Sequence, residues 1–459
     1  MPRTAQPVVR RLGPLGHPAR LTVAGFMAVN LLGAALLTLP VASESGEWTD
    51  PVTALFTSTS AISVTGLVVV DTSSYWSGFG EAVVLALIQA GGLGIMTAAS
   101  LLGLLVARRM GLRMQLIAQA ETKALRLGET RRVVLGVVIM SLTIELVTAL
   151  ILTARRLATT DDPFGSALYH GVFHAISAYN NAGFALQEDS LVGFASDPWT
   201  LVPMMVAFVL GGIGFPVVFE VVQVLRSRRR GRPVPGWSLH TKITVVTYAG
   251  LAAAGIALVT ALEWSNPATL GQLPWPSRLL GGLFHGLTPR TAGFNSVDVG
   301  AMHPTTLLIN DVLMFIGGGS AGTAGGIKVT TFALLAFVVY AEVRGQPTVH
   351  VMGRRLAASV QRQAISVVLL AVGVVMVATM VLLRLSHMPL DQVLFEVVSA
   401  FGTVGLSTGI TADLPAAGHL LLVAVMFLGR VGPITLASAL ALREHERRYE
   451  LPEERPIVG

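Results

Sequence analysis

Four short, mostly apolar segments of this sequence end in glycine, and each lies between two long apolar stretches. An apolar residue stands ten positions before each glycine; the phrases are Phe56–Gly66, Phe173–Gly183, Leu283–Gly293 and Phe395–Gly405. About ten residues form a short helix that enters a membrane partway, and the glycine permits a backbone turn whose carbonyls face a common axis. Four such turns could replace the water shell of a cation, so the pattern predicts a pore.

A second glycine-rich phrase follows each turn after roughly 24 to 28 residues; the copies are Gly91–Gly94, Gly211–Gly214, Gly317–Ser320 and Gly429–Gly432. Each unit therefore reads as helix, re-entrant half-helix, turn and helix. Small residues at one level of the inner helices allow close packing, and they also leave room at the axis. Both interpretations stay open from the sequence.

The composition indicates a membrane protein that can position these turns. Of 459 residues 53% are hydrophobic and 13% are charged, and the mean hydropathy is +0.67. A bilayer span needs roughly 20 apolar residues. Eight runs qualify, near 20–42, 82–106, 132–153, 199–225, 242–262, 305–340, 364–386 and 416–442. The sixth run is so long and glycine-rich that we expect a break in its middle.

The first twenty residues are basic, and no small-residue cleavage site follows a short apolar core, so we expect the first run to remain as a helix. The chain has no cysteine, which excludes disulfides, thiolate nucleophiles and zinc–thiolate sites.

Lysine and arginine concentrate on alternate connections between the runs. They gather in the first twenty residues, at 108–132, 226–242 and 342–363, and after residue 442. By the positive-inside rule these segments and both termini are cytoplasmic, and the glycine turns open outward. The net charge of +6 is then a signal of topology. The arginine runs at 226–232 and 443–448 could also suit nucleic acid, but anchoring of helix ends at the membrane is favoured, so no nucleic-acid partner is expected.

The chain resembles a known family. The fourfold arrangement, the turns VTGL, NAGF, TAGF and TVGL, the broken sixth span and the lone arginine of the last span are similar to the bacterial Trk/Ktr-type potassium transporters. Eight spans instead of ten point to the KtrB-like branch. The resemblance covers about residues 20–443. It implies an all-α polytopic membrane protein with four pseudo-repeats of helix, re-entrant pore helix and helix around one central pore.

On this scheme the pore repeats occupy residues 20–107, 132–226, 242–343 and 364–443. Cytoplasmic linkers join them at 108–131, 227–241 and 344–363, and cytoplasmic segments precede and follow them at 1–19 and 444–459.

The resemblance also implies a selectivity filter, in which backbone carbonyls bind potassium. Carried over residue by residue, the filter comprises Val64, Thr65, Gly66, Asn181, Ala182, Gly183, Thr291, Ala292, Gly293, Thr403, Val404 and Gly405. No second glycine follows the turn glycine, in contrast to the TVGYG run of tetrameric potassium channels. We therefore expect fewer stacked ion sites and looser discrimination. The alternative is four simple tight turns in outer loops.

The broken sixth span suggests a gate. Each glycine in a helix costs about 1 kcal/mol relative to alanine, so residues 317–328 should form a loop within the membrane. Non-helical backbone at that depth needs protein or a wet cavity around it. In the resembling family this segment is the intramembrane gate, and a rigid packed kink is the alternative. The gate residues would be Gly317, Gly318, Gly319, Ser320, Gly322, Gly325, Gly326 and Lys328.

Arg430 stands in the corresponding part of the last span, where an unpaired charge is costly. Its family counterpart implies a pore-lining barrier to cations; an ion pair with Glu145 or Glu220 is the alternative. The polar residues Thr57, His174, His285 and Glu396 recur near the starts of the half-helices. They could form a proton or metal site, although interfacial packing is favoured.

Enzyme-like motifs do not fit their surroundings. The segment Gly318–Gly322 matches G-x-S-x-G but lies in an apolar span, where the strand that precedes such a nucleophile is missing. The segment Gly326–Thr330 lacks the G-K-[ST] core of a phosphate loop. We therefore predict a protein that is not an enzyme and carries no resident cofactor other than potassium in the filter. It would take up potassium across the bacterial cytoplasmic (inner) membrane. The alternatives are a membrane-embedded enzyme and a less selective monovalent cation channel.

The resemblance implies two protein partners in addition to the lipid bilayer. One is a second copy of the chain, in a homodimer. The other is a soluble gating ring of nucleotide-binding subunits on the basic cytoplasmic face, similar to KtrA and TrkA, because the chain itself has no nucleotide motif.

Overall fold

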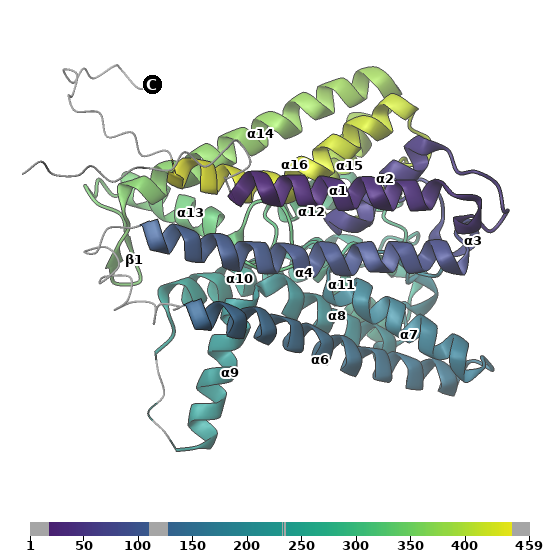
Figure 1. The fold of residues 1–459 in the computed structure, drawn as a ribbon, viewed down its shortest axis with the longest axis horizontal. Helices are drawn as coiled ribbons and strands as arrows, with labels where there is room; N and C mark the ends of the chain where they lie inside the picture. Colours follow the sequence, from purple (N-terminus) through teal and green to yellow (C-terminus); the bar gives the residue numbers. More distant parts are fainter. Residues whose placement is uncertain (1–17, 110–126, 232, 234–235, 443–459) are drawn as a thin grey trace, which may run out of the picture.

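The computed structural model describes residues 18–109, 127–231, 233 and 236–442. Most of the predicted N-terminal segment and first linker, and the whole C-terminal tail, lie outside these ranges. The described chain is almost entirely helical, and most helices run along the long axis of the molecule (Figure 1). In these ranges the strands are β1 (His350–Val351) and β2 (Arg354–Arg355), an antiparallel hairpin.

Four long helices open the four repeats: α1 (Pro18–Thr38), α6 (Leu127–Thr159), α10 (Leu239–Glu263) and α14 (Ala358–Ser386). Apolar side chains on their outer faces are exposed. On α14, for example, Leu369 is 67% exposed and Met380 is 58% exposed. Water would penalise such a surface and lipid would not, so these faces fit a bilayer.

A short helix follows in every repeat, and its C-terminal half is largely buried. These pore helices are α2 (Pro51–Ser63), α7 (Phe164–Tyr179), α11 (Trp275–Leu287) and α15 (Leu390–Gly402). Proline occupies the first turn of α2 and α11, where its missing N–H costs nothing. Asp50 caps α2 by accepting from the backbone N–H groups of Val52 and Thr53. The starts of α2 and α11 are therefore marked by their sequence.

The inner helices complete the repeats. They are α4 (Gly78–Arg109), the pair α8 (Pro198–Ile213) and α9 (Phe215–Arg229), the pair α12 (Pro304–Phe315) and α13 (Val329–Val343), and α16 (Ala416–Leu442). Short elements in the connections are α3 (Thr72–Tyr75) and the 3-10 turns η1 (Pro40–Ala42), η2 (Val192–Phe194) and η3 (Leu270–Gln272). Residues 316–328 separate α12 from α13 and form no helix.

The predicted span at 199–225 is sharply bent, which the sequence did not lead us to expect. The axes of α8 and α9 differ by 106°, and the bend falls at Gly214, whose φ is 96°. α9 therefore leaves the bundle almost at a right angle (Figure 1). Glycine reaches this conformation without steric cost, and Pro216 cannot donate a hydrogen bond back to the preceding turn.

By length and composition, three described helices can each cross a membrane: Val133–Thr159, Leu239–Glu263 and Ala358–Ser386. The bent pair α8–α9 qualifies when it is taken together, and shorter apolar helices occupy the other predicted spans. The molecule is thus a polytopic helical membrane protein.

Candidate functional site

The four glycine turns share one backbone conformation. In each turn the glycine and the residue two positions before it have positive φ, whereas the residue between them does not. The values are 56° and 94° for Val64 and Gly66, 59° and 71° for Asn181 and Gly183, 74° and 76° for Thr291 and Gly293, and 48° and 95° for Thr403 and Gly405. Alternation between positive and negative φ can turn successive carbonyls toward the same side, which is the arrangement that a carbonyl-lined ion site requires.

The same glycines form a closed ring. A methyl group on Gly66 would lie 2.4 Å from the Ala182 oxygen, and one on Gly183 would lie 3.0 Å from the Gly293 Cα. A methyl group on Gly293 would lie 2.3 Å from the Val404 oxygen, and one on Gly405 would lie 2.1 Å from the Thr65 oxygen. The repeats therefore follow one another around an axis in chain order. We call Gly66, Gly183, Gly293 and Gly405 the glycine ring; no larger residue fits at these positions.

A hydroxyl on the pore helix, or directly after it in the third repeat, braces the turn that follows in each repeat. Ser60 and Ser177 donate to the carbonyls of Leu67 and Phe184, and Thr288 donates to the carbonyl of Phe294, each at 2.7 Å. In the fourth repeat the Gly405 N–H donates to Ser399 Oγ at 3.1 Å. The sequence analysis missed these four side chains. Their signal is a serine six residues before the ring glycine in repeats one, two and four.

In the third repeat, the spacing from the buried phenylalanine and from the bracing hydroxyl to the ring glycine is one residue shorter than in the other repeats. Its hydroxyl, Thr288, stands five residues before Gly293. Phe56, Phe173 and Phe395 are fully buried; in the third repeat the buried residue is Phe284, whereas Leu283 is 36% exposed. The ten-residue register therefore does not hold there, and Phe284 is the structural counterpart of the other three phenylalanines.

Thr57, His174, His285 and Glu396 lie in the middle or later turns of the pore helices, not near their starts as predicted. They are not gathered into one site. The backbone N–H groups of Ser296 and Val297 donate to His285 Nε2, and Ser407 donates to Glu396 at 2.9 Å. The Leu186 N–H likewise donates to His174 Nε2 at 3.3 Å. His174, His285 and Glu396 thus hold the chain that leaves the glycine turn of their own repeat. Among the described residues, no three His, Cys, Asp or Glu side chains are grouped so as to hold a metal ion.

An open vestibule of about 580 Å³ has the glycine ring among its lining residues. Four acidic residues line it: Asp71, Glu188, Asp189 and Asp298. In the described part of the chain no Lys, Arg or His lines it. A concave surface with charge of one sign raises the local concentration of the opposite ion, so this vestibule attracts cations.

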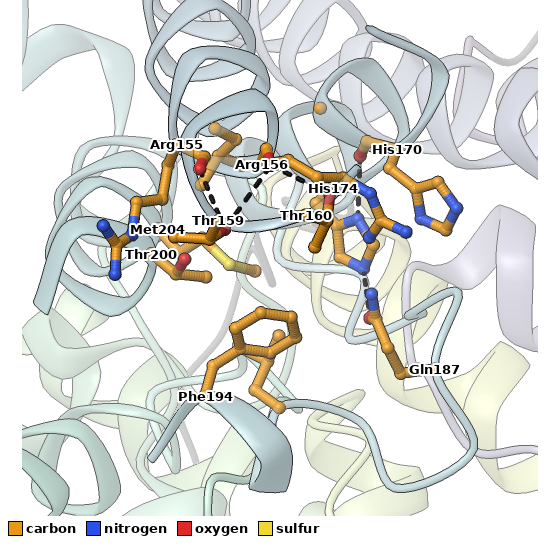
Figure 2. A pocket seen from close by; sticks show the side chains of 13 residues that line it. Arg155, Arg156, Thr159, Thr160, His170, His174, Gln187, Phe194, Thr200 and Met204 are labelled. Carbon is orange, nitrogen blue, oxygen red and sulfur yellow. Dashed lines mark hydrogen bonds between the residues drawn. The ribbon is translucent and has the colours of Figure 1, made fainter. Parts of the chain in front are cut away.

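Figure 2 shows a second hollow, of about 50 Å³, between α6, α7 and the connection to α8. The two arginines that line it are paired, Arg155 with Asp197 and Arg156 with Asp162. His174 donates from Nδ1 to the His170 carbonyl at 2.8 Å, and its Nε2 lies 2.9 Å from Gln187 Oε1. The hollow is too small for an organic substrate.

The eight predicted gate residues lie together in the 317–328 loop, where α8 holds their backbone. The Gly319 N–H donates to the Gly212 oxygen at 2.8 Å, and the Thr323 N–H donates to the Gly211 oxygen at 3.1 Å. These carbonyls belong to the last turn of α8, which ends at the Gly214 bend and leaves them without helical partners. The break after α8 in the second repeat thus leaves carbonyls free, and these accept hydrogen bonds from the N–H groups of the third repeat's loop.

Two cations lie at this loop. Arg430 is 3% exposed and donates to the carbonyls of Thr323 and Gly91. Lys328 donates to the carbonyl of Ala324 at 2.5 Å.

The acids proposed as alternative partners of Arg430 have other partners. Glu145 accepts from Gln89, Ser141 and Asn180, and Glu220 accepts from Ser238 and Thr241. Neither of these two acids is paired with Arg430.

Ser320 lacks the surroundings of a hydrolase nucleophile. Its Oγ lies 3.0 Å from Thr330 Oγ1, and the segment around it connects two helices rather than a strand and a helix. A nucleophile elbow needs a strand before the serine and a base beside it, so the loop serves no such chemistry.

Comparison with known proteins agrees with this architecture. The profile of the TrkH family, described as a cation transport protein, matches residues 17–448. The chain is 38% identical to Ktr system potassium uptake protein B of Bacillus subtilis, over 94% of this chain and 95% of that protein. It is 37% identical to Ktr system potassium uptake protein B of Vibrio alginolyticus, over 97% and 95% respectively.

The crystal structure of the potassium transporter TrkH from Vibrio parahaemolyticus has the same fold. Its TM-score is 0.67 at 18% identity, over 90% of this chain and 84% of that chain. The relatives are transport proteins rather than enzymes, which confirms the interpretation of this chain as a transporter. The family profile covers nearly the whole chain and the relatives match it end to end; this chain is a member of the TrkH/Ktr family of cation transport proteins.

Proposed function

We propose that this chain takes up potassium through a filter of backbone carbonyls at the glycine ring. The observation that carries the proposal is the closed ring of four turns with alternating φ. Carbonyls held at fixed spacing around an axis can replace the hydration shell of a cation, and selectivity arises from their number, field and spacing. The predicted filter residues supply these carbonyls from all four repeats. Two of the relatives bear the name potassium uptake protein, which favours potassium as the ion.

The 317–328 loop is the gate in this proposal, and Arg430 is the barrier beside it. A buried guanidinium that donates to the loop fixes the loop's position and repels cations that pass the ring. The acidic vestibule supports entry from the opposite side. Opening requires that the loop leave its contacts with α8 and Arg430.

The remaining assignments complete the proposal. The protein lies in the bacterial cytoplasmic membrane with both termini inside, as the distribution of basic residues favours. It forms a homodimer and is controlled by a nucleotide-binding gating ring on its cytoplasmic face. The name of the relatives, a Ktr system protein B, supports a partner component.

The test is radiolabelled rubidium uptake into liposomes that contain the purified chain, with potassium or sodium as competitor. Wild type should show uptake that potassium blocks better than sodium, and Gly293→Ser should weaken that preference, because its side chain meets the Val404 carbonyl. Gly373→Ser is the matched control, since nothing lies within 4 Å of a side chain added there. Equal block by both ions in wild type would favour the less selective cation channel. No flux, even with the loop shortened, would contradict a pore.

A further inference from the structure

Thr323 lies where three repeats meet. It belongs to the loop of the third repeat and is fully buried. Its carbonyl accepts from Arg430 of the fourth repeat. Its hydroxyl lies 3.2 Å from Asn181 Oδ1 and 3.3 Å from the Tyr179 carbonyl, both in the second repeat. One loop residue is thus bound to the proposed barrier and to the proposed filter.

The Asn181 side chain extends this connection to the next turn. Its Nδ2 donates to Thr291 Oγ1 at 3.2 Å and to the Arg290 carbonyl at 3.3 Å. A carbonyl only accepts, so the amide nitrogen must face Arg290, and the amide oxygen is left for the Thr323 hydroxyl. The orientation of the amide is therefore fixed by its partners. The hydrogen bonds run without a gap from Arg430 through Thr323 and Asn181 to Thr291.

Glycines of α8 make room for this contact. A methyl group on Gly211 would lie 1.9 Å from the Tyr179 oxygen and 2.9 Å from Thr323 Oγ1. One on Gly212 would lie 3.1 Å from Asn181 Nδ2. The segment Gly211–Gly214 therefore does more than allow close helix packing. The absence of side chains at Gly211 and Gly212 allows Thr323 of the loop to contact Tyr179 and Asn181.

We propose that Thr323 and Asn181 are positioning residues that couple the 317–328 loop to the filter. While the loop is seated, the Thr323 hydroxyl fixes the Asn181 amide, and the amide fixes the turns of the second and third repeats. A displacement that opens the loop withdraws this hydroxyl and relaxes the two turns. The inference rests on the proposed function, and it adds that ion preference depends on a side chain of the gate.

The experiment compares Thr323→Val with Thr323→Ser in the rubidium uptake assay. Valine keeps the shape and the backbone bonds but removes the hydroxyl, whereas serine retains a hydroxyl. We expect Thr323→Val to lower the preference for potassium over sodium roughly threefold to tenfold, the equivalent of one lost hydrogen bond, and Thr323→Ser to preserve it. Thr143→Val is the matched control, because that hydroxyl donates to the Ile139 carbonyl on the exposed face of α6.

The ratio of the two competitors separates coupling from gating. A residue that only holds the gate shut would change the uptake of all ions by one factor, so an unchanged ratio in Thr323→Val overturns the coupling. A ratio lowered equally in Thr143→Val overturns it as well. Wild type and Gly293→Ser run in the same series. If Gly293→Ser shifts the ratio and Thr323→Val does not, only the coupling is wrong; if wild type shows no selective uptake, the proposed function fails too.

Discussion

At the scale of single residues, three β-branched side chains occupy backbone conformations that such residues avoid. Val64, Thr291 and Thr403 have φ of 56°, 74° and 48°. A conformation of this kind costs about 1 to 3 kcal/mol and persists only where the surroundings enforce it. Asn181, in the equivalent place, pays less, because asparagine tolerates this region. Among the described residues, the β-branched side chains with positive φ are these three, and all lie in the glycine turns, which supports the proposed filter.

The pore-helix hydroxyls hold the turns in this conformation, so their removal should lower the preference for potassium over sodium. In Ser177→Ala the Phe184 carbonyl loses its partner inside the protein. We expect a loss of about 1 to 3 kcal/mol in the free energy of unfolding and a weaker preference for potassium over sodium. Thermal unfolding in detergent and competitive rubidium uptake measure the two effects.

Ser366→Ala is the control for this change. Its hydroxyl donates to the Arg362 carbonyl on the exposed face of α14, so neither the melting temperature nor the preference should move. If Ser177→Ala lowered the melting temperature and left the preference intact, the hydroxyl would stabilise the fold without shaping the filter.

At the scale of helices, the sequence allowed the apolar spans, the half-helices and the family to be predicted, because each depends on local pattern. It did not allow the bend at Gly214 to be predicted. The segment Gly214–Pro216 tolerates a bend but does not require one. The bend is stabilised by hydrogen bonds from the 317–328 loop, which is more than a hundred residues away in the chain. The shorter spacing in the third repeat was missed for a related reason: Leu283 preserves the apolar pattern, and only the hydroxyl at Thr288 reveals the shift.

The interlocked breaks of α8–α9 and α12–α13 predict that Gly214→Ala disturbs the gate. The new methyl group would lie 2.3 Å from the Ser320 carbonyl, at a backbone φ of 96°. The loop must then move away from α8, and we expect faster uptake in the absence of any partner. Initial rates of rubidium uptake at equal protein content measure this. Gly250→Ala on α10, where nothing lies within 4 Å, should match wild type, and an equal effect of both variants would point to general destabilisation.

At the scale of the whole molecule, one chain supplies every turn of the glycine ring. The contacts run from Gly66 to the second repeat, from Gly183 to the third, from Gly293 to the fourth and from Gly405 back to the first. Because the four repeats differ in sequence, each can have a separate structural role. The second holds the loop of the third, and the fourth supplies the arginine beside it. A pore of four identical chains could not give its four repeats different structural roles.

A ring closed within one chain predicts that pores in an oligomer act independently. When wild type and Gly293→Ser are reconstituted together, each pore is formed by a single chain. It therefore has either four wild-type turns or three wild-type turns and one altered turn, and no pore combines turns from two chains. The competition curve of the mixture should therefore be the sum of the two pure curves, weighted by the fraction of each protein. Liposomes with graded fractions at constant total protein measure this. Pores assembled from several chains would produce additional components of intermediate preference, most abundant near equal fractions, and their appearance would contradict the ring that the contacts describe.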